Sequence, residues 1–455
     1  MLYKAITIIL LSFICFTAAA QHHEQGEKSL KSFFEKGKYD LHARSIFMST
    51  LNKDELPDFS TLGIGAGIGY RSPYYKNFRI GISGFFIFQL YEHNLGDENG
   101  TGLGNRYELT LYDMHDPENK QDLDRLEELF IEYKRKGLGI TLGRQKVHSP
   151  FLNEQDNRMR PNLFSGLLAN YGIIKWVFDG GWLSGVSPRG TIRWYAVEDS
   201  YGVYPFGKNV FGEPSGYKNN ISSKGIGLLG IKYNSEYGRH QLWNYFAENV
   251  FNLSLGQIDY QLPLEEHSLL FGAQGFYQTA INQGGNPDPA KSYIQPGDDA
   301  YGMGLRSGIK MGGHQLSLNY LGISNNGRFL FPREWGREVF FASLPRERYE
   351  GSGGTNAYTL KYDYAIPGKN ITTMAGIGKV DMPAVHDYEL NKYGLPSYYH
   401  FAGRIDYRPK GFLDGMDIML QAVHKRAQEP QNLGEKDFLN KADMWNLTVI
   451  ADFRY

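Results

Sequence analysis

Basic side chains occupy single positions within short segments in which apolar and polar residues alternate. Between residues 300 and 311, for example, Tyr301, Met303 and Leu305 share one side of an extended chain, and Arg306 and Lys310 fall on the other. The same alternation places seven basic residues opposite the apolar side of their segments. They are Lys175, Arg193, Lys232, Arg306, Lys310, Lys361 and Arg404. The first two lie in the predicted strands 166–178 and 191–198, in which Ile174 and Ile192 are expected to face lipid.

Rows of Lys and Arg along the inside of a pore attract anions, as they do in anion-conducting channels. The sequence therefore predicts a cationic track that guides anionic or carboxylate-bearing solutes. A second interpretation stays open, in which these charges pair with acidic residues and stabilise the wall. The acidic residues with the matching orientation are Glu128, Glu132, Asp363, Asp406, Asp417 and Asp452.

The elements that must position these charges are extended strands, and the last twelve residues show the pattern best. Trp445, Leu447, Val449 and Phe453 alternate with mostly polar residues up to the aromatic Tyr455. Bacterial outer-membrane barrels commonly end in this way, because their last strand pairs with the first and faces lipid. We expect the barrel-assembly machinery to recognise this strand.

Strand-like segments recur along the whole chain from residue 39, about eighteen in number, and their connections alternate between short and long. Short connections on one rim and long loops on the other are typical of an antiparallel transmembrane barrel with short periplasmic turns and long outer loops. We therefore predict an all-β fold of this kind for residues 39–455. A secreted β-sandwich that binds or cleaves glycans is the alternative from another class.

Composition limits the remaining functions. Residues 1–20 have the apolar core and the Ala18-Ala19-Ala20 end of an export signal, and residues 21–38 form a predicted periplasmic leader. Removal of the signal leaves 47 basic against 49 acidic residues and no cysteine, since Cys15 is the only one. This balance argues against nucleic acid as a partner, and cysteine-based catalysis, disulfides and thiolate metal sites are excluded.

No metal, cofactor or enzyme signature is expected. His148 beside Ser149, and the stretch from Asp113 to Asp116 with His115, could be imagined as catalytic or metal-binding groups. Neither has a spacing that would bring ligands together on one helix or strand. We predict a protein that is not an enzyme.

One long loop carries a family resemblance. Gly143-Arg144 is followed by Pro150, Asp156-Asn157-Arg158, Pro161 and Phe164-Ser165-Gly166, and the segment Ser32–Gly37 precedes the first strand. These stretches resemble the OprD-type specific porins of the outer membrane. The resemblance implies a barrel of eighteen strands that passes small solutes, often amino acids or carboxylates, through an eyelet formed by the third and seventh outer loops.

In this chain those loops would be residues 145–165 and 324–355, folded toward the lumen. We expect Arg144, Arg158 and Arg160 to contact solute, with Glu154 and Asp156 on the opposing wall. The second loop has five arginines against four glutamates, so a self-paired surface loop is an equal alternative.

The predicted function is therefore passive, charge-selective diffusion of small hydrophilic solutes through the outer membrane. Its surroundings would be membrane lipid and lipopolysaccharide. A hydrophobic-substrate channel of the long-chain fatty-acid type is an alternative, although residues 21–38 are short for the plug that such a channel needs.

Overall fold

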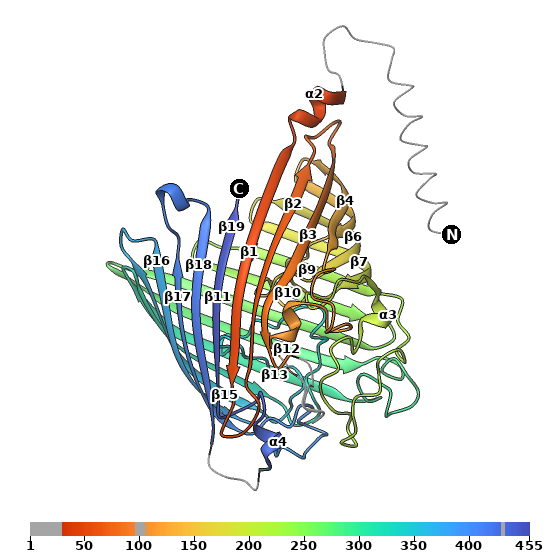
Figure 1. Ribbon diagram of the computed structural model, residues 1–455, viewed down its shortest axis with the longest axis vertical. Coiled ribbons are helices and arrows are strands. Elements are labelled where there is room, and N and C mark those ends of the chain that lie inside the picture. The colour runs from red at the N-terminus through yellow and green to blue at the C-terminus, as the bar shows by residue number, and fades with distance from the viewer. Residues whose placement is uncertain (1–29, 96–104, 106, 429–432) are drawn as a thin grey trace.

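The computed structural model describes residues 30–95, 105, 107–428 and 433–455, and its strands form one continuous antiparallel sheet (Figure 1). In chain order the strands are β1 (Lys38–Leu51), β2 (Phe59–Arg71), β3 (Phe78–His93), β4 (Arg125–Arg135), β5 (Leu138–Gln145), β6 (Leu163–Ile173), β7 (Trp176–Ser187), β8 (Tyr195–Ala196), β9 (Ile226–Asn234), β10 (Gly238–Ala247), β11 (Phe251–Leu264), β12 (His267–Ala280), β13 (Asp299–Met311), β14 (His314–Ile323), β15 (Asn356–Ile366), β16 (Ile371–Asp381), β17 (Tyr398–Tyr407), β18 (Met416–Ala427) and β19 (Met444–Arg454).

The sheet closes on itself because the first and last strands pair. The β1–β19 ladder runs from His42 opposite Arg454 to Leu51 opposite Trp445, and every other wall strand pairs with its two neighbours. Of the 19 strands in the sheet, β8 has only two residues, and β7 pairs directly with β9. The described wall therefore contains 18 strands, which confirms the predicted barrel and excludes the β-sandwich alternative.

Short helical segments lie outside the wall. They are α2 (Leu30–Glu35), α3 (Val197–Ser200) and α4 (Glu435–Phe438), with 3-10 turns at Leu109–Leu111 and Gly411–Leu413. No helix in the described parts of the chain is long and apolar enough to cross a membrane. The export signal predicted at residues 1–20 and residues 21–29 of the predicted leader lie outside the described residues.

The two rims of the barrel differ in the length of their connections. One rim, where both β1 and β19 have their terminal ends, has connections as short as two residues, such as 136–137, 174–175, 265–266 and 312–313. The other rim has loops L2 (94–124), L3 (146–162), L4 (188–225), L6 (281–298), L7 (324–355), L8 (382–397) and L9 (428–443). Two connections on this rim are short: 52–58 between β1 and β2 has seven residues, and 248–250 between β10 and β11 has three.

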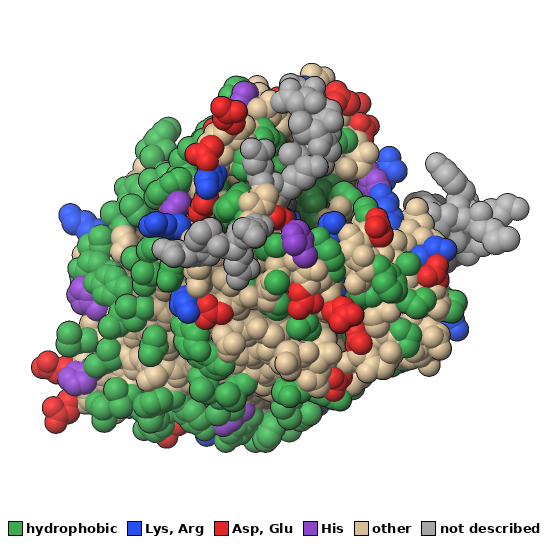
Figure 2. Space-filling view, turned by 90° about the horizontal axis from the view of Figure 1, so that it is seen from below, with side chains coloured by type: hydrophobic (Ala, Val, Ile, Leu, Met, Phe, Trp, Pro, Cys, Tyr) green, Lys and Arg blue, Asp and Glu red, His purple; other side chains and the backbone are tan. Residues whose placement is uncertain are grey.

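Alternation along the strands separates an apolar outer face from a mixed inner face. Tyr301, Met303 and Leu305 are exposed on the outside of β13, and Trp445 and Leu447 are exposed on β19. Charge on a lipid-facing wall costs about 2–4 kcal/mol at mid-membrane, which explains why the basic residues of these strands point inward. Figure 2 looks onto the long-loop end, where loop atoms fill much of the ring and apolar side chains gather along its left and lower edge.

Candidate functional site

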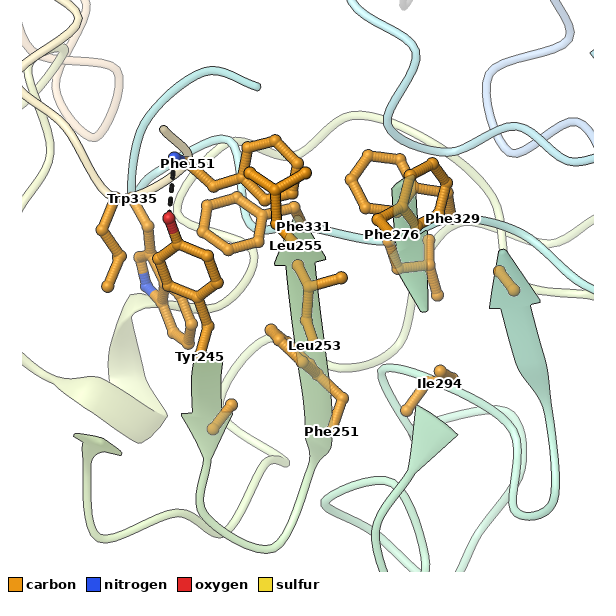
Figure 3. Packing of buried hydrophobic residues seen from close by; sticks show 14 of the residues in the cluster. Phe151, Tyr245, Phe251, Leu253, Leu255, Phe276, Ile294, Phe329, Phe331 and Trp335 are labelled. Atoms are coloured by element: carbon orange, nitrogen blue, oxygen red, sulfur yellow. Dashed lines mark hydrogen bonds between the residues drawn. The ribbon is translucent and has the colours of Figure 1, made fainter. Parts of the chain in front are cut away.

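L3 and L7 pack against each other and against the inner wall. The ring of Phe151 in L3 lies 5.5–5.8 Å from the rings of Phe329, Phe331 and Phe340 in L7. It also stacks on Tyr245 of β10 at 5.7 Å, and its backbone N–H donates to the Tyr245 hydroxyl (3.2 Å; Figure 3). Full burial of such a ring contributes about 1.5–3 kcal/mol, so this aromatic cluster holds both loops inside the barrel.

Hydrogen bonds from Asn153 join the two loops further. Its side-chain amide donates to the carbonyl of Arg337 (2.8 Å) and accepts from the Arg337 backbone N–H (3.1 Å). Its own backbone N–H donates to the carbonyl of Trp335, a side chain that is completely buried. Hydrogen bonds therefore join L3 and L7 in addition to the aromatic cluster.

Glu347 is the second anchor of L7. Its carboxylate accepts from Tyr398 (2.5 Å) and His400 (2.6 Å) on β17 and from the Lys425 ammonium on β18 (3.2 Å). Burial alone would raise the pKa of Glu347, but Lys425 and His400 outweigh it and hold this pKa at about 2. The carboxylate is therefore charged at neutral pH and fixes L7 to the wall.

Two further glutamates of L7 also form ion pairs with basic residues. Glu338 pairs with Arg348 (2.9 Å), and Glu350 pairs with Arg333 (2.7 Å) and with Lys392 of L8 (3.2 Å). L7 therefore pairs with itself at Glu338 and Glu350, as the self-paired alternative expects, whereas Glu347 pairs with the wall.

Several arginines have no ion pair among the described residues, and four of them meet at one site. Arg158 of L3, Arg189 of L4, and Arg337 and Arg346 of L7 line one small cavity of about 70 Å³. Their hydrogen bonds go to neutral groups only: Thr110 Oγ1 (2.6 Å), the carbonyls of Gln155 (3.2 Å) and Leu344 (2.9 Å), and the side chains of Asn446 (2.9 Å) and Thr448 (2.7 Å). Positive charge is thus concentrated around this small cavity, which we call the L3–L7 constriction.

Burial lowers the pKa of each of these four arginines. Burial is the main cause that lowers the pKa of Arg346 to about 10 and that of Arg189 to about 9. For Arg158 burial also lowers the pKa, and the neighbouring Arg346 and Arg189 lower it further. Arg346 and Arg189 remain protonated at pH 7, so an anion that entered would relieve a repulsion that already exists.

A wider chamber adjoins this constriction. Its cavity of about 540 Å³ shares Asn157, Arg337 and Arg346 with the smaller one. Lys310, Lys361 and Arg404 also line it, from β13, β15 and β17. Basic side chains therefore follow one another from the L3–L7 constriction into the chamber.

The other predicted wall residues are partnered. Lys232 pairs with Asp179 of β7 (2.7 Å), and Arg404 pairs with Asp406 of its own strand. Arg306 lies over the Phe341 ring (4.1 Å) and 3.7 Å from Asp259, and Arg144 lies over the Trp194 ring (4.6 Å). For these positions both interpretations of the sequence, pore lining and wall pairing, remain compatible with the contacts.

Lys175, which was predicted to face the lumen, is not on a strand. Lys175 and Ile174 form the two-residue turn between β6 and β7, where the sequence had suggested one continuous strand. Ile174 has a φ of +52° and is 98% exposed. The turn was missed because it contains neither Gly nor Asn, the residues that usually adopt such a conformation.

Arg193 lies in L4, exposed, and the strand predicted for residues 191–198 is reduced to Tyr195–Ala196. Ile192, expected to face lipid, instead packs against an inner cluster that includes Leu111 and Met159. Apolar alternation in this stretch reflects contact with L2 and L3. It does not reflect contact with lipid.

The predicted loop residues have separate roles. Arg160 is completely buried and donates to the carbonyls of Leu123 (2.9 Å) and Tyr112 (3.3 Å), so it supports L2 and is not open to a solute. Glu154 pairs with Lys146 (3.0 Å) and His148 (2.9 Å). Asp156 reaches the wall, where it pairs with Arg44 of β1 (2.5 Å) and Arg454 of β19 (3.2 Å).

Sequence reasoning missed Arg189 and Lys425 and did not separate Arg337 and Arg346 from the other arginines of L7. The loop's composition was the only available signal. Which of its arginines pair with a carboxylate depends on how the loop folds back on itself, and no local pattern encodes this fold.

A closed barrel of 18 strands with loops folded into its lumen defines a membrane channel. The sequence matches the family described as outer membrane porin, OprD family, over residues 31–401, and the chain belongs to this family. It is accordingly an outer-membrane porin, with its short turns toward the periplasm and its long loops outside. The fatty-acid-type alternative is not retained.

Solved structures with the same fold are distant in sequence. OpdK of Pseudomonas aeruginosa, described with vanillate, has a TM-score of 0.71 and 14% identity, covering 93% of this chain and 99% of its own. OccAB4 of Acinetobacter baumannii has a TM-score of 0.72 and 12% identity, covering 92% and 98%. A BenF-like porin from Pseudomonas fluorescens Pf-5 has a TM-score of 0.71 and 13% identity, covering 93% and 99%. Comparison with curated protein sequences gave no match.

Proposed function

We propose that this porin passes small hydrophilic anions, carboxylates and amino acids among them, by passive diffusion and selects them at the L3–L7 constriction. The observation that carries the proposal is the set of four arginines without ion pairs around a cavity of about 70 Å³. The guanidinium group offers a planar fork that matches a carboxylate, so a passing anion gains both charge and hydrogen bonds.

The chamber next to the constriction extends the proposal. Lys310, Lys361 and Arg404 would form the cationic track on the wall and lead the anion onward. Arg404 already pairs with Asp406, and Arg144, Arg306 and Lys232 also have partners, so these four would contribute more weakly than Lys310 and Lys361. The vanillate of the OpdK structure, itself a carboxylate, fits the same solute class.

The proposal also covers the setting of the protein. Residues 1–20 would direct export, residues 21–38 would form a periplasmic leader, and β19 with Tyr455 would be read by the barrel-assembly machinery. Lipopolysaccharide would surround the outer rim. Transport would involve no catalytic step and no cofactor.

Reversal potentials in planar bilayers under a salt gradient test the proposal. The wild-type channel should prefer chloride over potassium, and Arg337→Gln and Arg346→Gln should each weaken that preference. Removal of one charge about 8 Å from the ion, at an effective dielectric constant of about 40, changes its energy by about 1 kcal/mol, or roughly fivefold in the permeability ratio. Lys175→Met removes an equal charge from the periplasmic turn and serves as the control, with no expected change. A cation-preferring wild-type channel would overturn the proposal.

A further inference from the structure

The inner face of the β1–β19 seam, where the barrel closes, is also the place where L3 docks. Arg44 on β1 lies directly opposite Asp452 on β19 in the strand ladder. From this position its side chain reaches inward to the tip of L3, at residues 156–158. Only 4% of the Arg44 side chain is exposed, so a passing solute does not touch it.

All the N–H groups of the Arg44 guanidinium have acceptors. Nε and Nη2 donate to Asp452 (3.1 and 2.8 Å), which holds the group to the seam. Nη1 and Nη2 donate to Asp156 (2.5 and 3.3 Å), and Nη1 also donates to the backbone carbonyl of Arg158 (2.7 Å). Five donors in a rigid fork are therefore shared between the wall and the loop.

These contacts fix the L3 backbone on both sides of Asn157. Asn157 lines both cavities, and its side-chain oxygen accepts from Arg189. Arg158 lines the constriction itself. The orientation of two of the four arginines without ion pairs thus depends on where Arg44 holds the tip of L3.

We propose that Arg44 and Asp156 are positioning residues for charge selection: their contact at the closure seam aims Arg158 and Arg189 into the constriction. The inference rests on the proposed anion selectivity for its physiological meaning. Its structural content, that Asp156 and not Asp452 controls the selecting groups, can be tested whichever ion the channel prefers.

Asp156 and Asp452 provide a matched pair of variants. Each bonds to Arg44, and replacement of either by Asn removes one negative charge from the same region of the lumen. Simple electrostatics therefore predicts the same small gain in anion preference for both variants. Positioning predicts opposite results, because only Asp156 belongs to L3.

The experiment compares reversal potentials of wild type, Asp156→Asn and Asp452→Asn in planar bilayers at one salt gradient. We expect Asp452→Asn to keep or slightly raise the chloride preference and Asp156→Asn to lower it at least threefold, with added current noise from a mobile L3. Arg44→Lys, which keeps the charge but loses the fork, should behave like Asp156→Asn. The heat-modified mobility of each barrel on gels confirms that it is folded.

Equal shifts of the reversal potential in Asp156→Asn and Asp452→Asn would overturn the inference, because charge alone would then explain both. If only Arg44→Lys fails to fold, the two Asn variants still decide. A cation-preferring wild type would defeat the proposed function, while a difference between the two Asn variants would still support the positioning role.

Discussion

The anchor of L7 on the wall leads to a prediction about one ion pair. Glu347 and Lys425 are both almost completely buried, with Oε1 and Nζ 3.2 Å apart. At an effective dielectric constant of 20 this separation corresponds to about 5 kcal/mol of gross attraction, part of which offsets desolvation. Loss of one partner leaves a buried charge unpaired, and we expect Glu347→Gln or Lys425→Met to weaken L7 docking by about 3 kcal/mol.

Limited trypsin digestion measures this change, because Arg337, Arg346 and Arg348 of L7 are cleavage sites that docking protects. When opening and closing are fast, the cleavage rate follows the population of the open loop, so about 3 kcal/mol corresponds to roughly 100-fold faster nicking. The double variant Glu347→Gln/Lys425→Met removes both charges and should return to within about tenfold of wild type. If the effects of the two single variants simply multiply in the double variant, the buried pair is not the anchor.

The aromatic cluster, the buried acid of L7 and the periplasmic turn give three further predictions. Phe151→Ala should accelerate trypsin cleavage of L7 and weaken loop docking by about 3–5 kcal/mol, whereas Phe412→Ala, on a fully exposed ring, should change it by less than about 0.5 kcal/mol. Burial raises the pKa of Glu334 from 4.5 to about 7. Protonation of this carboxyl group therefore contributes stability to the folded state that is fully present below pH 4.5 and is lost as the pH rises through 7. Glu334→Gln should therefore exceed wild type in thermal stability at pH 8 by up to about 3 kcal/mol, and a gap that does not grow between pH 5 and pH 8 would contradict this. Lys175→Met should leave single-channel conductance unchanged. A reduced conductance would indicate that the side chain of Lys175 faces the lumen.

The sequence predicted the barrel well where lipid dictates the pattern. On β13 and β19 one face meets hydrocarbon, so apolar residues must recur at every second position, and Tyr301 and Trp445 are exposed as expected. Prediction failed where the same pattern has another cause. Ile192 is apolar because it packs inside the barrel, and the turn at Ile174 lacks the residues that mark turns.

The four arginines without ion pairs at the L3–L7 constriction were harder to predict than the wall. All of L7 could be recognised as rich in charge, but Arg333 and Arg348 differ from Arg337 and Arg346 only in their partners. Those partners depend on how the loop folds back on itself and on the wall strands that it meets. A spacing rule describes neighbours along one strand, so it cannot assign them.

Both loops make contacts at the β1–β19 seam, so the proposed selectivity depends in part on the last strand. Asp156 of L3 binds Arg44 and Arg454, and Arg346 of L7 binds Asn446 and Thr448, so each loop has part of its contacts on the last strand. A barrel without β19 would lose these contacts together with the seam, so closure of the wall and the proposed selectivity would depend on the same strand.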